Sequence, residues 1–156
     1  MLVGGSGAGK SWWSRRHFLE TEVVSSDRCR ALVCDDETNQ AVNREAFAVF
    51  YAIVRQRLSL RRLTVADSTA LQAFARQRLA ELAAGCGVPA HAVLFATTVD
   101  RMVENNLRRE RRVPDHVVLA HARSMEELTV ERLAAEGFAA VHRLPPPLDG
   151  PPASAR

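Results

Sequence analysis

A glycine-rich segment near the start of the sequence constrains the fold more than any other feature. Residues 4–11 read Gly-Gly-Ser-Gly-Ala-Gly-Lys-Ser and match the pattern G-x-x-x-x-G-K-[ST] without exception. Backbone N–H groups can converge on phosphate oxygens only where few side chains obstruct them, and a helix expected from Lys10 adds its positive dipole end. The segment therefore predicts a phosphate-binding loop between a strand and a helix. The alternative is a glycine-rich turn with a coincidental lysine.

Two side chains of this loop have predicted roles of their own. Lys10 is the only lysine beside 20 arginines, which indicates a position that requires a compact ammonium group. We expect it to reach the β- and γ-phosphates of a nucleotide, and we expect the Ser11 hydroxyl to ligate Mg²⁺. The predicted nucleotide-binding residues of the loop are Gly4, Gly5, Ser6, Gly7, Ala8, Gly9, Lys10 and Ser11.

Segments typical of strands and helices alternate along the chain. The patterns predict strands at 1–3, 22–26, 62–67, 91–96 and 138–144, and helices at 10–20, 40–60, 71–82, 98–109 and 115–136. This alternation predicts an α/β P-loop NTPase fold, with a mostly parallel five-stranded sheet and helices on both faces. The first strand is unusually short, which indicates either a truncated start or a marginally held edge of the sheet.

The composition fits one intracellular globular domain. The chain has 156 residues, of which 47% are apolar and 25% charged, and no run approaches the ~20 apolar residues of a membrane helix. Three cysteines without a CxxC pair favour a reducing cytoplasm over a disulfide framework or a closed zinc site. The net charge of +3 is too small to establish nucleic-acid binding by itself. We therefore expect a cytoplasmic protein with no membrane partner.

Two aspartates come at the ends of predicted strands. Because the carboxyl ends of parallel strands meet at one edge of the sheet, Asp27 and Asp67 are both expected beside the loop. Asp27 is suited to accept a proton from an alcohol that attacks the γ-phosphate, and Arg30 to bind an anionic acceptor. Asp67 has the position of a Walker-B-type carboxylate that holds Mg²⁺. The alternative for each aspartate is a helix N-cap.

An arginine-rich segment follows the fourth predicted strand. One helical face is predicted to carry Arg101, Asn105, Arg108, Arg109 and Arg112. An arginine face above a phosphate-binding loop is typical of a lid that clamps phosphates. The alternative is a solvated helix face.

The whole pattern resembles the bacterial polynucleotide 5′-kinase family, and most closely the kinase module of polynucleotide kinase–phosphatases. The resemblance covers about residues 1–143. It is carried by the loop ending Gly-Lys-Ser, Val-Ser-Ser-Asp-Arg-Cys-Arg at 24–30, Asp-Asp-Glu at 35–37, Leu-Thr-Val-Ala-Asp-Ser-Thr at 63–69 and the arginine-bearing lid.

The resemblance implies roles for individual residues. Lys10 and Ser11 would hold ATP and the metal, Asp27 would be the general base on the 5′-hydroxyl, and Arg30 would bind the phosphate next to that hydroxyl. Gln40 would lie near the acceptor, and Arg109 matches one of the two lid arginines. The sequence departs from the family at Asn105, where the other lid arginine falls, and at Ala70, where the family has asparagine.

The expected function is ATP- and Mg²⁺-dependent phosphorylation of a 5′-OH DNA or RNA end in nucleic-acid repair, alongside separate phosphatase or ligase proteins. The expected domain spans residues 1–144, with its lid at about 98–115, and a proline-rich, disordered tail follows at 145–156. Two alternatives remain open at this point. One is a small-molecule kinase that acts on a nucleoside, sugar or antibiotic hydroxyl, and the other is a nucleotide-binding module without transferase activity.

Overall fold

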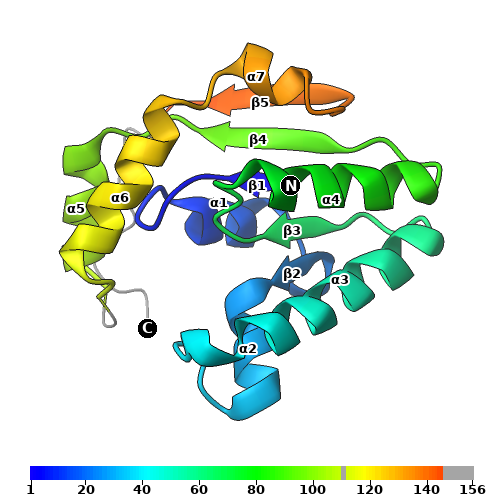
Figure 1. Ribbon diagram of the computed structural model, residues 1–156, viewed down its shortest axis with the longest axis horizontal. Helices are drawn as coiled ribbons and strands as arrows, with labels where there is room; N and C mark the ends of the chain where they lie inside the picture. Colours follow the sequence, from blue (N-terminus) through cyan, green and yellow to red (C-terminus); the bar gives the residue numbers. More distant parts are fainter. Residues whose placement is uncertain (110–111, 146–156) are drawn as a thin grey trace.

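The computed structural model describes residues 1–109 and 112–145 and shows a parallel sheet flanked by helices (Figure 1). The tail expected to be disordered lies outside the described residues from position 146 onward. The helices and strands follow one another along the chain as β1 (Leu2–Val3), α1 (Lys10–His17), η1 (Glu20–Glu22), β2 (Val23–Ser25), α2 (Ser26–Cys34), η2 (Gln40–Val42), α3 (Asn43–Ser59), β3 (Val65–Asp67), α4 (Ala73–Gly85), β4 (His91–Phe95), α5 (Val99–Leu107), α6 (Asp115–Glu126), α7 (Val130–Ala134) and β5 (Ala140–Leu144).

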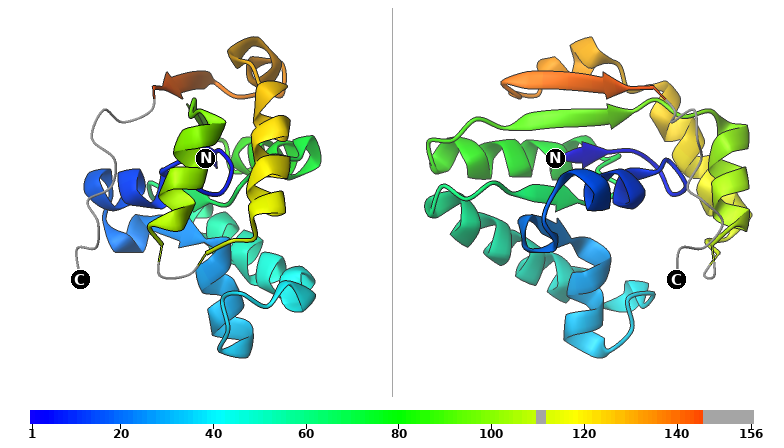
Figure 2. Two further views of the ribbon diagram at one scale, coloured as in Figure 1. Left: turned by 90° about the vertical axis from the view of Figure 1, so that its left-hand side faces the viewer. Right: turned by 180° about the vertical axis from the view of Figure 1, so that it is seen from behind.

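The sheet confirms the predicted fold class. Its five strands have the order β2-β3-β1-β4-β5, and every neighbouring pair is parallel. Helices α3, α4 and α7 cover one face and α1 covers the other, while α5 and α6 lie side by side at the carboxyl ends of the strands (Figures 1 and 2). This arrangement leaves the carboxyl edge of the sheet as the place where loops from several strands meet.

The shortest strand is the central one. Leu2 and Val3 are 1% and 0% exposed, and they pair with Val93 and Leu94 of β4, while Leu2 also pairs with Asp67 of β3. The interpretation of this segment as a marginal sheet edge is therefore wrong. Two residues suffice because neighbours on both sides satisfy their backbone groups and apolar side chains cover both faces.

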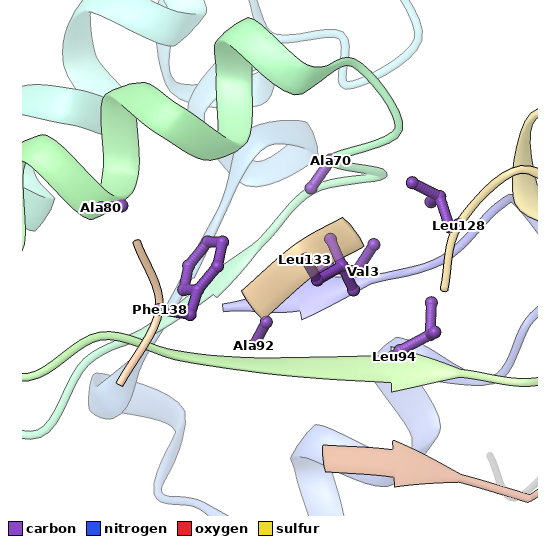
Figure 3. Close-up of a cluster of buried hydrophobic side chains, with 8 residues drawn as sticks. All are labelled: Val3, Ala70, Ala80, Ala92, Leu94, Leu128, Leu133 and Phe138. Carbon is purple, nitrogen blue, oxygen red and sulfur yellow. The ribbon is translucent and has the colours of Figure 1, made fainter. Parts of the chain in front are cut away.

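Apolar side chains join the helices to the sheet on the α4 and α7 face. Figure 3 shows this cluster, in which Leu133 of α7 and Phe138 lie against Val3, Ala92 and Leu94 of the central strands. A second cluster packs Phe50 and Val54 of α3 against Val24 of β2. Within the described ranges, no helix is both long enough and apolar enough to span a bilayer.

Several predicted element boundaries differ from the structure. The segment after β2 forms helix α2, which begins one residue before Asp27 and has Ser25 as its N-cap, with Ser25 Oγ accepting from the Arg28 N–H at 3.4 Å. The interpretation of Asp27 as a helix N-cap is therefore wrong, because Ser25 is the N-cap.

The predicted helix at 115–136 is two helices. Thr129 is the N-cap of the second one, and its Oγ1 accepts from the Arg132 N–H at 3.1 Å.

Candidate active site

The glycine-rich loop connects central strand β1 to helix α1, as predicted. Gly9 takes a left-handed conformation with φ +92° and leads into α1, whose Trp13 nitrogen donates to the Gly9 carbonyl at 3.0 Å. At the other end of the loop, the Gly4 nitrogen donates to the carbonyl of Thr69 after β3, at 3.1 Å. The loop is thus held at both ends, and its backbone forms the turn that a nucleotide phosphate requires.

Lys10 lies inside this turn. Its Nζ donates to the carbonyls of Gly4 and Gly5 at 2.7 and 3.0 Å. Burial lowers the pKa of Lys10 to about 8; the charge of Asp67 opposes that shift and the charge of Arg109 adds to it. An anionic phosphate at this position would supply the negative charge that the partly buried ammonium lacks.

Ser11 and Asp67 lie together at the carboxyl edge of the sheet. Ser11 Oγ donates to Asp67 Oδ2 at 3.1 Å, and Asp67 is 8% exposed at the end of β3. Burial raises the pKa of Asp67, whereas the charge of Lys10 and the hydrogen bond from Ser11 lower it. Because α4 begins only at Ala73, with Gln72 as its N-cap, the interpretation of Asp67 as a helix cap is wrong.

This pair of oxygen donors fits Mg²⁺. A hydroxyl and a carboxylate are hard ligands of the kind that Mg²⁺ prefers. Nowhere in the described ranges do three or more His, Cys, Asp or Glu side chains gather in a metal-binding group. A site with few protein ligands suits Mg²⁺ bound by nucleotide phosphates and water, because this ion dehydrates reluctantly.

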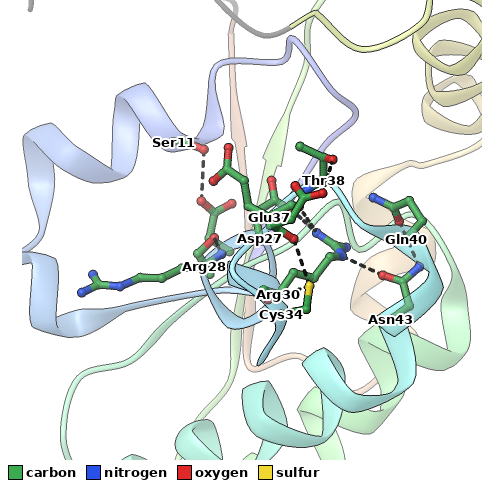
Figure 4. Close-up of polar contacts among 12 residues, drawn as sticks. Ser11, Asp27, Arg28, Arg30, Cys34, Glu37, Thr38, Gln40 and Asn43 are labelled. Atoms are coloured by element: carbon green, nitrogen blue, oxygen red, sulfur yellow. Dashed lines mark hydrogen bonds and ion pairs between the residues drawn. The ribbon is translucent and has the colours of Figure 1, made fainter. Parts of the chain in front are cut away.

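Asp27 and Arg30 form the opposite side of the site. Arg30 Nη1 donates to Asp27 Oδ1 in an ion pair between adjacent turns of α2 (Figure 4). The Arg30 side chain is 7% exposed, whereas that of Asp27 is 62% exposed. The charge of Asp27 acts on both Lys10 and Asp67, which places its carboxylate on the same rim as the phosphate-binding loop.

A chain of hydrogen bonds extends this pair to Gln40. Arg30 Nε donates to Asn43 Oδ1 at 2.8 Å, and Asn43 Nδ2 donates to Gln40 Oε1 at 2.9 Å (Figure 4). Arg30 Nη1 also lies 3.4 Å from the carbonyl of Glu37. The resemblance-based residues Asp27, Arg30 and Gln40 are therefore brought together around the buried guanidinium.

The predicted arginine face of the lid does not form. Helix α5 ends at Leu107, so Arg109 and Arg112 are not on it, and Arg101 and Arg108 both form ion pairs with Glu104. The helix ends there because Asn106 bonds to both backbone groups of Val113 in the returning chain. Arg109 nevertheless lies close enough to the loop for its charge to lower the pKa of Lys10.

Asn105 occupies the place where the resemblance expects a lid arginine. Its side chain is buried against the loop, and Nδ2 donates to the Gly7 carbonyl at 2.8 Å. From α6, His121 Nδ1 accepts from the Ser6 nitrogen at 3.2 Å. Sequence reasoning missed His121, because one histidine on an amphipathic helix carries no signal of its tertiary partner.

A comparison with protein families places this arrangement among known domains. A family model described as an AAA domain (AAA_33) matches residues 1–128, which is most of the chain and includes the loop, both aspartates and the lid. No curated protein matches the chain. The loop geometry and the five-stranded parallel sheet agree with the P-loop NTPase-like character of this domain. The chain therefore belongs to the AAA domain family AAA_33, a P-loop family that includes kinases.

Proposed function

We propose that this protein is an ATP- and Mg²⁺-dependent kinase that transfers the γ-phosphate of ATP to the 5′-hydroxyl of a DNA or RNA end. The observation that carries the proposal is the Asp27–Arg30 ion pair on the rim beside Lys10. A nucleotide-binding loop alone would serve many activities. A carboxylate beside it, paired with a buried guanidinium, adds the means to receive an alcohol next to an anion.

The chemistry follows from the charges on the two sides. The 5′-oxygen forms a bond to the γ-phosphorus, the bond from that phosphorus to the β–γ bridging oxygen breaks, and ADP leaves. Asp27 receives the proton of the hydroxyl. General-base catalysis of this kind contributes about 10²- to 10⁴-fold in rate. Lys10 and Arg109 neutralise charge on the phosphates, and Ser11 and Asp67 would hold Mg²⁺, which would supply further positive charge against the transferring phosphate.

The polynucleotide end is favoured as acceptor by the position of Arg30. Its Nη1 orients Asp27 and its Nε is held by Asn43, and within the described residues its Nη2 makes no hydrogen bond. A phosphate beside the acceptor hydroxyl can therefore bind Nη2 without displacing Asp27. A free alcohol with no adjacent anion would gain nothing from this guanidinium.

The test compares three acceptors with labelled ATP and Mg²⁺: a 5′-OH oligonucleotide, the matching nucleoside 3′-phosphate and the plain nucleoside. We expect label on the first two and not on the third. Label on the plain nucleoside alone would favour a small-molecule kinase. ATP binding with no label on any of the three would favour a nucleotide-binding module without transferase activity.

Asp27→Asn provides the matching test of the base. We expect kcat to fall about 10²- to 10⁴-fold with the Kd for ATP within 2-fold of the original. Asp35→Asn is the matched control, because Asp35 has φ +57° at the end of α2 and asparagine tolerates that conformation. An unchanged kcat in Asp27→Asn would remove the proposed base.

A further inference from the structure

Two uncharged side chains, one from helix α5 and one from helix α6, form hydrogen bonds to the backbone at the apex of the phosphate-binding loop. Asn105 of α5 donates to the Gly7 carbonyl at 2.8 Å, and His121 of α6 accepts from the Ser6 nitrogen at 3.2 Å. Asn105 is 6% exposed, and burial, together with the charge of Lys10, lowers the pKa of His121, which favours the neutral ring. Both contacts join residues more than 90 positions apart in the chain.

With these contacts, two peptide groups of the loop form hydrogen bonds through both their carbonyl and their N–H. In the Gly5–Ser6 peptide, the carbonyl accepts from Lys10 Nζ at 3.0 Å and the N–H donates to His121. In the Gly7–Ala8 peptide, the carbonyl accepts from Asn105 and the N–H donates to the Gly5 carbonyl at 3.2 Å. A nucleotide that draws Lys10 toward its phosphates removes one of these bonds but leaves those of Asn105 and His121 in place.

The packing around the same two peptides is close. A Cβ at Gly7 would lie 2.3 Å from the Met102 carbonyl oxygen, and a Cβ at Gly5 would lie 2.5 Å from Met102 Cε and 2.8 Å from His121 Cβ. Helices α5 and α6 therefore touch the loop backbone directly. The conformation of the loop depends on these helices as well as on its own glycines.

The charge at position 105 matters for this contact. Lys10 already places a partly buried cation in the loop, and Arg109 acts on it from the lid side. A second buried cation at 105 would be unfavourable until a nucleotide supplied negative charge. A neutral amide can hold the Gly7 carbonyl whether or not a nucleotide is bound.

The buried Oδ1 atom of Asn105 indicates that this residue does more than stabilise the fold. Its Oδ1 is buried and has no hydrogen-bond partner within the described residues, the one side-chain atom there in this condition. An unpaired buried acceptor destabilises the folded state, and such breaks of local rules in native proteins concentrate at functional sites.

We propose that Asn105 is a positioning residue that preforms the phosphate-binding loop for the nucleotide by holding the Gly7 carbonyl, with His121 holding the neighbouring peptide. This proposal rests on the nucleotide-binding part of the proposed function and does not depend on the acceptor. At position 105 the resemblance expects an arginine that binds phosphate. The proposal instead gives this position to a neutral amide that binds the loop backbone.

The experiment compares Asn105→Leu with the original protein by hydrogen–deuterium exchange of peptides that cover residues 4–10, without nucleotide. Leucine has the same branched arrangement of side-chain heavy atoms as asparagine and removes the hydrogen bond. We expect these amides to exchange about 3- to 10-fold faster, the range for loss of one net hydrogen bond. The Kd and KM for MgATP should rise by a similar factor, while the KM for the acceptor stays unchanged.

Asn106→Leu is the matched control. Asn106 is the next residue on α5 and is fully buried, but it bonds to Val113 and not to the loop. We expect it to lower the thermal midpoint without faster exchange at residues 4–10. Unchanged exchange at 4–10 in a folded Asn105→Leu protein, or equal acceleration in Asn106→Leu, would overturn the proposal. Because exchange is measured without nucleotide or acceptor, it tests Asn105 even if the proposed kinase activity fails.

Discussion

Arg76 provides the most quantitative prediction, because a single buried guanidinium ties together two distant parts of the chain. Arg76 of α4 is 1% exposed, and its Nε and Nη2 each lie 2.6 Å from one carboxylate oxygen of Glu136. Its Nη1 donates to the carbonyls of Ala70 and Leu71 at 2.9 and 2.7 Å. Ala70 has φ +49°, a conformation that alanine rarely adopts. The guanidinium thus forms hydrogen bonds both to the buried carboxylate of Glu136 and to the carbonyls of the strained turn at Ala70 and Leu71.

The expected loss of stability follows from what each substitution leaves behind. Arg76→Met leaves the Glu136 carboxylate, whose side chain is 8% exposed, buried without its partner, which costs about 3–5 kcal/mol. Glu136→Leu leaves the guanidinium buried without its carboxylate partner, at a similar cost. The double substitution removes both charges and leaves the carbonyls of Ala70 and Leu71 unpaired, at about 1–3 kcal/mol each. Arg76→Met leaves the same two carbonyls unpaired, so their cost is common to the single and the double variant and cancels. The two single losses together should therefore exceed the loss in the double variant by at least about 2 kcal/mol, because only the single variants leave a buried charge without its partner.

The assay is urea unfolding of the four proteins, followed by circular dichroism and analysed as a double-mutant cycle. In a chain of this size each kcal/mol corresponds to about 2–4 °C in the thermal midpoint, so Arg76→Met should melt roughly 6–20 °C lower. A loss below about 1 kcal/mol in Arg76→Met would refute the assignment of a structural charge pair. Additive single losses would refute the coupling.

Four further predictions concern the phosphate-binding side. The affinity for ATP should fall as pH rises past about 8. Lys10 has a pKa of about 8 without nucleotide, so above that pH it must take up a proton to bind phosphate. Calorimetry in two buffers of different ionisation enthalpy measures this proton uptake. Over the same window, from about pH 8 toward the ordinary lysine value of 10.5, the unfolded chain holds more protons, so stability of the nucleotide-free protein should rise with pH. Asp67→Asn should raise the Mg²⁺ concentration for half-maximal activity by roughly tenfold or more without loss of thermal stability, since it also removes a buried charge; an unchanged Mg²⁺ titration would contradict the assigned ligand. Gly7→Ala should abolish ATP binding, because φ is +84° and the new Cβ meets the Met102 carbonyl. Gly9→Ala, at φ +92° with open space around the new Cβ, should cost only backbone strain of about 1–2 kcal/mol. Equal thermal shifts for the two variants would argue against the Met102 contact.

The parts of the site that are local in sequence could be predicted. The loop at 4–11 can be recognised from its glycines, lysine and serine, and the positions of the ends of β2 and β3 follow from the rule that parallel strands share a carboxyl edge. Asp67 could therefore be placed beside Ser11 without coordinates, and the structure joins them at 3.1 Å.

The parts set by tertiary contact could not be predicted. Helix α2 has no buried apolar stripe, since Leu32 and Val33 are exposed, so its hydrophobic period gives no helix signal. The lid helix stops at Leu107 because Asn106 bonds to Val113, a contact that the charge pattern does not encode. The burial of Arg76 depends on Glu136, which lies 60 positions later.

The central position of β1 has a consequence for how the protein is made. Leu2 and Val3 leave the ribosome before their strand partners, which lie at residues 67, 93 and 94. At usual rates of synthesis these partners follow roughly 3 to 18 s later, so during that time two strongly apolar residues have no strand partners in the nascent chain. The phosphate-binding loop begins at the very next residue. Nucleotide affinity should accordingly arise late in biosynthesis, only after the middle of the polypeptide has emerged.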